Sequence, residues 1–185
     1  MRFGFIVICC FWAALLLSCK EVTYPKTQPA GIAALQQLPQ SICGEYLIRD
    51  KATGEIGDTI IIETWGYRTK DATGREWLGA GHISDTLVVK QYENYYFINF
   101  KEGDQWILRL LNVKNPNRLE LLSINLEDDV VREEIIKKLG KKFNVKTNKQ
   151  NDYVFYQINP TPAQLMSLIK ENYFTGVELI RKRSN

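Results

Sequence analysis

The clearest hydrophobic pattern in the chain lies between residues 86 and 124. Four segments there alternate apolar and polar side chains: 86–92, 95–101, 105–112 and 118–124. Short turns rich in Gly, Asn, Asp and Pro separate these segments. Alternation over such lengths predicts strands that bury one face. Connections this short join antiparallel neighbours. We therefore expect an antiparallel meander.

The segments before the meander also favour strands. Residues 44–49 predict a first strand, and residues 58–67, with the β-branched run Ile60–Ile62, predict a second one. Three glycines, Gly74, Gly79 and Gly81, interrupt the next segment, so a loop followed by an irregular or bulged strand is expected over residues 68–82.

Two helices are predicted after the meander. Val131, Ile135 and Leu139 form an apolar stripe that indicates a helix over 128–139, with Gly140 as its expected stop. The sequence Thr161-Pro162-Ala163-Gln164 is typical of a capped helix start, and the second helix is expected over 161–173.

Short strands are expected between the helices, near 142–146 and 152–158, and a closing strand over 177–182. The predicted fold class is therefore α+β: a mainly antiparallel meander with two helices packed on it. The sheet is expected to be curved, and a barrel-like form and a sandwich both stay open.

The N-terminus has the pattern of an export signal. Residues 3–17 are an apolar run that follows a single basic residue, Arg2, as in the hydrophobic region of a signal peptide. The run is shorter than the roughly 20 apolar residues that a transmembrane helix needs.

The tetrapeptide Leu16-Leu17-Ser18-Cys19 resembles the lipobox of bacterial lipoproteins. Leu16, Ser18 and Cys19 match the motif, whereas Leu17 is bulkier than the residue usually found there. The resemblance covers the first 19 residues and implies that the leader is cut before Cys19, which would carry a diacylglycerol and an acyl chain such as palmitate. Two or more chains anchor a protein stably to a membrane.

This resemblance divides the chain into three parts: a signal peptide (1–18), the lipidated cysteine with a flexible, proline-bearing tether (19–41) and one β-rich domain (42–185). Position 20 is Lys rather than the Asp that favours inner-membrane retention, which favours the outer membrane of the cell envelope. Lys20-Glu21 resembles part of the surface-export signal of Bacteroidota lipoproteins, but Val22 departs from it. The periplasmic side and the cell surface therefore both stay open.

Composition argues against several functions. The net charge is only +3, from 24 basic and 21 acidic residues, which gives no electrostatic case for nucleic-acid binding. Of the four cysteines, only Cys43 would remain as a free thiol. His82 is the only histidine, and no motif joins it to Cys43 as a nucleophile–base pair. We therefore expect no enzyme, no cofactor and no metal site.

The strand region is rich in aromatic residues that could line a ligand cavity or simply pack in a core: Trp65, Tyr67, Trp77, Tyr95 and Trp106. The leading hypothesis is an envelope lipoprotein, anchored through Cys19, that binds or scaffolds another envelope protein. Two alternatives remain: a lipocalin-like carrier of a small apolar ligand, and an immunity protein against a secreted toxin.

Overall fold

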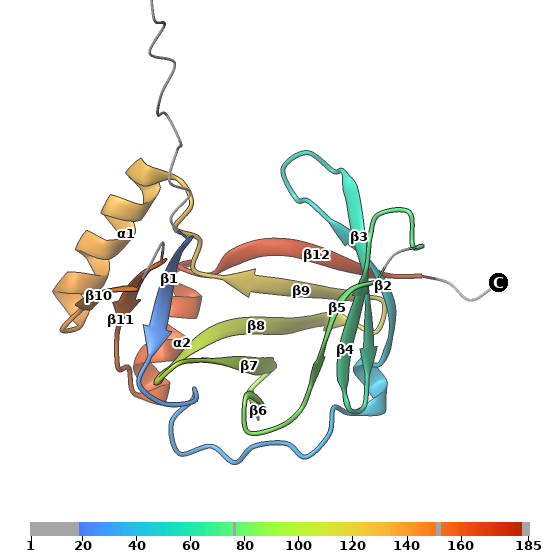
Figure 1. Cartoon of the computed structure of the whole chain (residues 1–185), viewed down its shortest axis with the longest axis horizontal. Helices are drawn as coiled ribbons and strands as arrows, with labels where there is room; N and C mark the ends of the chain where they lie inside the picture. The colour runs from blue at the N-terminus through green and yellow to red at the C-terminus, as the bar shows by residue number, and fades with distance from the viewer. Residues whose placement is uncertain (1–18, 76, 151–152, 183–185) are drawn as a thin grey trace, which may run out of the picture.

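The computed structural model describes residues 19–75, 77–150 and 153–182. Within them the fold is α+β, as predicted: one large curved sheet dominates, and two α-helices accompany it (Figure 1). The predicted leader, with the first three lipobox positions, lies outside the described residues.

The predicted meander is confirmed. It consists of β6 (Leu87–Tyr92), β7 (Tyr95–Glu102), β8 (Gln105–Asn115) and β9 (Arg118–Ser123), and each strand pairs antiparallel with the next. Glu93 and Gly103 take positive φ angles of 51° and 56°, which allow the tight turns on either side of β7.

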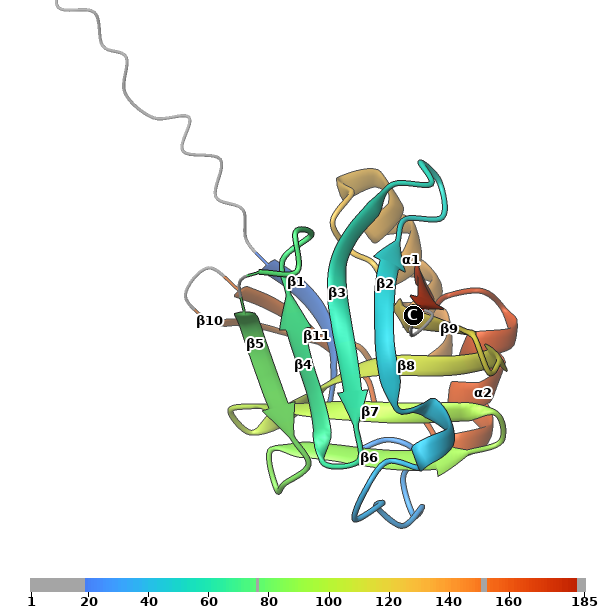
Figure 2. The same ribbon diagram turned by 90° about the vertical axis from the view of Figure 1, so that its right-hand side faces the viewer.

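Four strands precede the meander: β2 (Gly44–Arg49), β3 (Ile56–Glu63), β4 (Gly66–Lys70) and β5 (Trp77–His82). The prediction of one strand over 58–67 is wrong, because Thr64 and Trp65 form a turn that divides it into β3 and β4. The predicted irregularity is confirmed as a shift of register between Thr69 and Lys70. Figure 2 shows β2–β5 running across β6–β8.

The C-terminal part follows the predicted order. It comprises α1 (Asp129–Lys142), β10 (Lys146–Gln150), β11 (Tyr153–Gln157), α2 (Pro162–Lys170) and β12 (Thr175–Arg181). The strand expected near 142–146 is wrong in position, because α1 extends to Lys142 and the strand is Lys146–Gln150. The predicted capping box of α2 is confirmed: the Thr161 hydroxyl accepts from the Gln164 N–H, and the Gln164 side chain accepts from the Thr161 N–H.

The two helices end differently from the prediction. Gly140 does not stop α1, which continues to Lys142. A glycine stops a helix when it takes the left-handed conformation, and Gly140 does not have a positive φ. Helix α2 ends at Lys170 rather than at residue 173, shortly before Asn172, whose φ is 60°.

The prediction of a flexible tether over 19–41 is wrong at its beginning, where residues form β1 (Cys19–Tyr24). This strand pairs with β11 in parallel and with β8 antiparallel. Val22, Thr23 and Tyr24 are at most 4% exposed. A segment buried this deeply between two strands cannot act as a flexible tether, because its hydrogen bonds and apolar contacts hold it in the sheet.

Residues 25–38, which we call the strap, continue from β1 across β6 and β7. Asn99, which is fully buried, accepts from the Gln28 N–H at 2.7 Å and donates to the Gln28 carbonyl at 2.9 Å. Lys90 donates to the carbonyls of Thr27 and Pro29 at 3.1 and 2.9 Å. The strap is therefore held by buried polar groups, and the short helix η1 (Gln40–Ile42) leads from it into β2.

The strand pairs follow the order β10-β11-β1-β8-β9-β12-β2-β3-β4-β5, and β7 and β6 continue the sheet from the other edge of β8. The path ends at β5 and β10, so within the described residues the sheet is curved and open.

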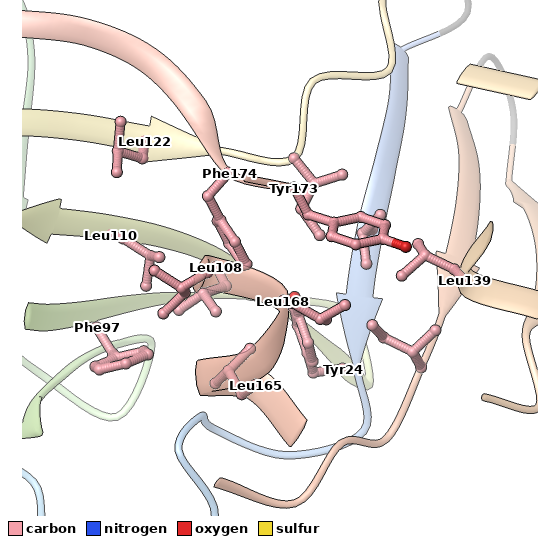
Figure 3. Packing of buried hydrophobic residues seen from close by; sticks show 14 of the residues in the cluster. Tyr24, Phe97, Leu108, Leu110, Leu122, Leu139, Leu165, Leu168, Tyr173 and Phe174 are labelled. Carbon is pink, nitrogen blue, oxygen red and sulfur yellow. The ribbon is translucent and has the colours of Figure 1, made fainter. Parts of the chain in front are cut away.

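The sheet separates two apolar cores. Figure 3 shows the first, in which α2 covers the meander; its members include Tyr24, Phe97, Leu108, Leu110, Leu139, Leu165, Leu168 and Phe174. The second lies inside the curve, between β2–β4 and the meander; its members include Leu38, Tyr46, Ile60, Ile62, Val89, Tyr96, Leu111 and Leu179. Strands β7 and β8 contribute to both cores and so form the central layer.

An ionic cluster links the β2–β3 turn to β9. Glu120 accepts hydrogen bonds from Lys51 at 2.7 Å and Asn112 at 3.0 Å, and Lys114 lies 3.1 Å away. Burial raises the pKa of Glu120, but the hydrogen bonds from these three side chains together outweigh it, so the pKa lies below its ordinary value of 4.5.

Candidate functional site

The inner core is incompletely filled. A cleft of about 380 Å³ remains between β2–β4 on one side and the meander on the other. It lies where β2–β4 cross the strands of the meander (Figure 2), and the side chains between the two parts of the sheet do not close the space. This volume falls within the range of roughly 300–1,000 Å³ that small-molecule sites occupy.

The wall of the cleft is largely aliphatic and aromatic. The side chains that line it come from eight strands and the strap: Leu38, Ile48, Ile60, Ile62, Tyr67, Leu87, Val89, Ile98, Phe100, Ile107, Leu111, Leu121 and Leu179, together with Thr69 and Arg109. Several of them, including Ile48, Ile98 and Phe100, are only half-buried. The cleft therefore offers apolar surface that the chain itself does not cover.

Two aromatic rings meet across the cleft. Tyr67 on β4 contacts Phe100 on β7 edge to face, with ring centroids 6.3 Å apart. Burial raises the pKa of the Tyr67 hydroxyl. This ring contact joins the two walls on which the lining residues lie.

Arg109 is the charged side chain in the lining. Its guanidinium pairs with Glu21 of β1, with contacts of 2.5 and 3.1 Å. The pair is three-quarters buried. Because Glu21 already balances the charge, the cleft does not present an unpaired cation to its interior.

Two glycines determine the shape of the wall. A Cβ on Gly81 would lie 2.6 Å from Leu87 Cδ1 and against the Tyr67 ring, so a side chain there would push two lining residues into the cleft. Gly66 has a φ of 150°, and a Cβ there would collide with the Gly81 carbonyl. Gly66 and Gly81 thus allow β4 and β5 to approach beside the cleft, and of the two only Gly81 belongs to the glycines that predicted an irregular strand.

The five aromatic residues singled out from the sequence are dispersed, and only Tyr67 lines the cleft. Trp65 stacks on His82 with ring centroids 4.2 Å apart. Trp77 is 51% exposed, and Arg68 and Lys70 lie 4.5 and 4.6 Å from its ring.

The other two belong to the outer core. Tyr95 and Trp106 both pack against it, and Lys101 Nζ lies 5.5 Å from the Trp106 ring. The prediction from the sequence missed most of the lining residues. The pattern that could have indicated them is the aliphatic face of the meander, not the aromatic residues.

The remaining side chains that could be reactive or bind a metal lie outside the cleft. Cys43 is a half-buried thiol whose Sγ lies 3.5 Å from the Pro39 carbonyl oxygen. Burial raises the pKa of the Cys43 thiol, which leaves it a poor nucleophile. In the part of the chain that the structure describes, no three His, Cys, Asp or Glu residues gather as metal ligands.

Among the described residues, neither α1 nor α2 combines the length and the apolar character needed to span a membrane.

Comparisons with other proteins add no family to this description. No protein-family model, curated protein or solved structure matches the chain.

Proposed function

We propose that this protein is an envelope lipoprotein, anchored through Cys19, that binds an apolar small molecule in the cleft inside its curved sheet. The observation that carries the ligand proposal is the cleft itself: about 380 Å³ of space walled by half-buried aliphatic and aromatic side chains. The lipobox resemblance at residues 16–19 supports the anchor.

The chemistry of the wall indicates the class of ligand. Thirteen of the named lining side chains are aliphatic or aromatic, and the charge of Arg109 is balanced by Glu21. An apolar chain gains free energy when such surface excludes water, at about 25 cal/mol for each Å² buried. A charged or strongly polar ligand would lose hydration without matching partners. We therefore infer that the ligand is a hydrocarbon chain, such as that of a fatty acid or another lipid.

Photocrosslinking can test this proposal with the full chain in cells. Cells that produce the protein are given a fatty acid with a diazirine in its chain, irradiated and analysed by peptide mass spectrometry. We expect crosslinks on peptides of β7 and β8 that contain Ile98, Phe100 or Ile107, and excess palmitate should suppress them.

Two variants of β7 sharpen the test. Ile98→Trp adds a large ring inside the cleft and should reduce crosslinking about tenfold, which corresponds to about 1.4 kcal/mol of binding free energy. Lys101→Trp adds the same ring on the exposed end of the same strand and should leave crosslinking unchanged. Equal crosslinking in both variants, or crosslinks confined to other strands, would refute ligand binding in the cleft.

The hypothesis of a protein-binding scaffold stays a prediction. It differs from the ligand proposal in one measurable respect: a scaffold should keep its partner when Ile98→Trp fills the cleft.

A further inference from the structure

Among the described residues, each exposed large apolar side chain lies near the start of a strand or helix. There are six of them: Ile56, Trp77, Leu78, Val130, Val131 and Tyr153, and they are between 45% and 77% exposed. Each lies within the first three residues of β3, β5, α1 or β11. These are the residues with which elements begin, rather than a random sample of the surface.

These elements all begin at the same end of the molecule. In the orientation shared by Figures 1 and 2, β1, β3, β5, β11 and α1 start in the upper part of both views. The pairings agree: Cys19 pairs with Tyr153 at the start of two parallel strands, and Lys20 Nζ lies 3.3 Å from Asp129 at the start of α1. The six exposed apolar residues therefore belong to elements that begin at the end where Cys19 enters the fold. We call this end the anchor face.

The absence of a tether makes the anchor face significant. The sequence alone predicted a flexible segment after Cys19, but β1 begins at Cys19 itself. A lipid on Cys19 would thus be attached directly to the sheet. A bilayer holding that lipid must lie against the elements that begin beside Cys19.

We propose that the anchor face docks on the phospholipid bilayer that holds the Cys19 lipid, with Trp77 and Tyr153 at the headgroup level. This inference rests on the anchor part of the proposed function. Trp and Tyr are the residues that membrane–water interfaces favour, since their rings are apolar while each carries a polar group. Arg68 and Lys70 flank the Trp77 ring within 4.6 Å. Arg68 is paired with Glu63 at 2.5 Å, so Lys70 is the cation here that suits contact with phosphate groups.

Burial of the exposed apolar side chains would favour one orientation of the domain on the bilayer. Ile56, Leu78 and Val130 would each bury surface against the bilayer, whereas a freely tethered domain would leave them in water. The docked state holds the curved sheet at a fixed angle to the membrane. It places the start of every strand named above at the lipid surface.

Quenching of tryptophan fluorescence by brominated lipid can test the docking. The full chain, produced in bacteria and purified from membranes, is reconstituted into vesicles of phosphatidylethanolamine and phosphatidylglycerol with bromines high on the acyl chains. The variant Trp65→Phe/Trp106→Phe leaves Trp77 as the tryptophan of the mature chain. We expect bromination to remove about half of its emission, because interfacial tryptophans lie near the top of the acyl chains.

A matched variant supplies the control. Trp77→Phe/Trp106→Phe leaves Trp65, which lies in the turn at the other end of β3 and β4, about 16 Å away along the strand at about 3.3 Å per residue. Its emission should be unchanged by bromination. Near-UV circular dichroism of both variants verifies that the fold is retained.

The outcomes separate the two proposals. Incorporation of labelled palmitate with quenching of Trp77 but not of Trp65 supports docking. Incorporation of palmitate without quenching of Trp77, or with equal quenching of both tryptophans, overturns docking and leaves the anchor standing. A chain that takes up no palmitate and keeps its leader overturns the anchor and the docking that rests on it.

Discussion

Replacement of Asn99 by alanine tests whether residues 25–38 belong to the folded domain or form a tether. The Asn99 side chain is fully buried and bonds both backbone groups of Gln28. Its amide nitrogen also lies 3.1 Å from the carbonyl oxygens of Val88 and Phe97. Alanine would keep the strand and remove each of these contacts.

The size of the effect follows from the groups left without partners. The N–H and the carbonyl of Gln28 would both lose their bond to residue 99, and each buried, unsatisfied polar group costs about 1–3 kcal/mol. We expect Asn99→Ala to reduce the free energy of unfolding by about 3 kcal/mol, since water admitted beside the strap would offset part of the loss. That is a large part of the roughly 5–15 kcal/mol typical of a domain.

Denaturation by urea, followed by near-UV circular dichroism, gives this free energy, and limited proteolysis reports cleavage within residues 25–38. The control is Asn94→Ala in the exposed β6–β7 turn, which should change stability by less than about 0.5 kcal/mol. If Asn99→Ala matches Asn94→Ala in stability and in resistance to protease, the strap is not part of the cooperative fold and the reasoning fails.

Three further predictions concern pH, backbone space and the anchor. Because the pKa of Glu120 is lowered in the folded state, its contribution to stability is present above about pH 4.5 and is lost as the pH falls below it. Glu120→Gln should therefore flatten the pH dependence of the free energy of urea unfolding between pH 5 and 3. An unchanged pH dependence would contradict this role of Glu120. Gly66→Ala should lower stability by more than about 2 kcal/mol in thermal or urea unfolding, since its Cβ would strike backbone, whereas Gly79→Ala, with its nearest neighbour at 3.9 Å, should cost about 1 kcal/mol or less. Cys19→Ser should abolish incorporation of labelled fatty acid and leave an uncleaved precursor or a soluble form, and retention of label in membranes would exclude the lipobox assignment.

Local patterns predicted the elements well where one short segment carried the whole signal. The capping box of α2 depends on four consecutive residues, and the structure has it as predicted. The meander depends on alternation within each strand and on turns too short for other connections. The division of residues 58–67 was missed because Thr64 and Trp65 have no strong turn preference, and the turn arises from pairing between β3 and β4.

The candidate site was less predictable, because a cleft is a property of packing. The aromatic residues that drew attention are mostly elsewhere, and the wall is built from aliphatic positions that would look the same in a filled core. No single segment of the sequence determines how closely two parts of one curved sheet pack where they cross.

By itself, the sequence determined the α+β class, the order of most strands and helices, and the motif that marks Cys19, since each depends on neighbouring residues alone. Only the tertiary structure decided that the segment after Cys19 is β1 and a strap rather than a tether, because the partners that hold it, Asn99 and Lys90, are more than 60 residues away in the chain. Contacts at such separations depend on how the whole sheet curves. The tertiary structure also left the cleft open inside the curved sheet and placed the starts of β3, β5, β11 and α1, which carry six exposed apolar residues, at the end where the chain enters the fold.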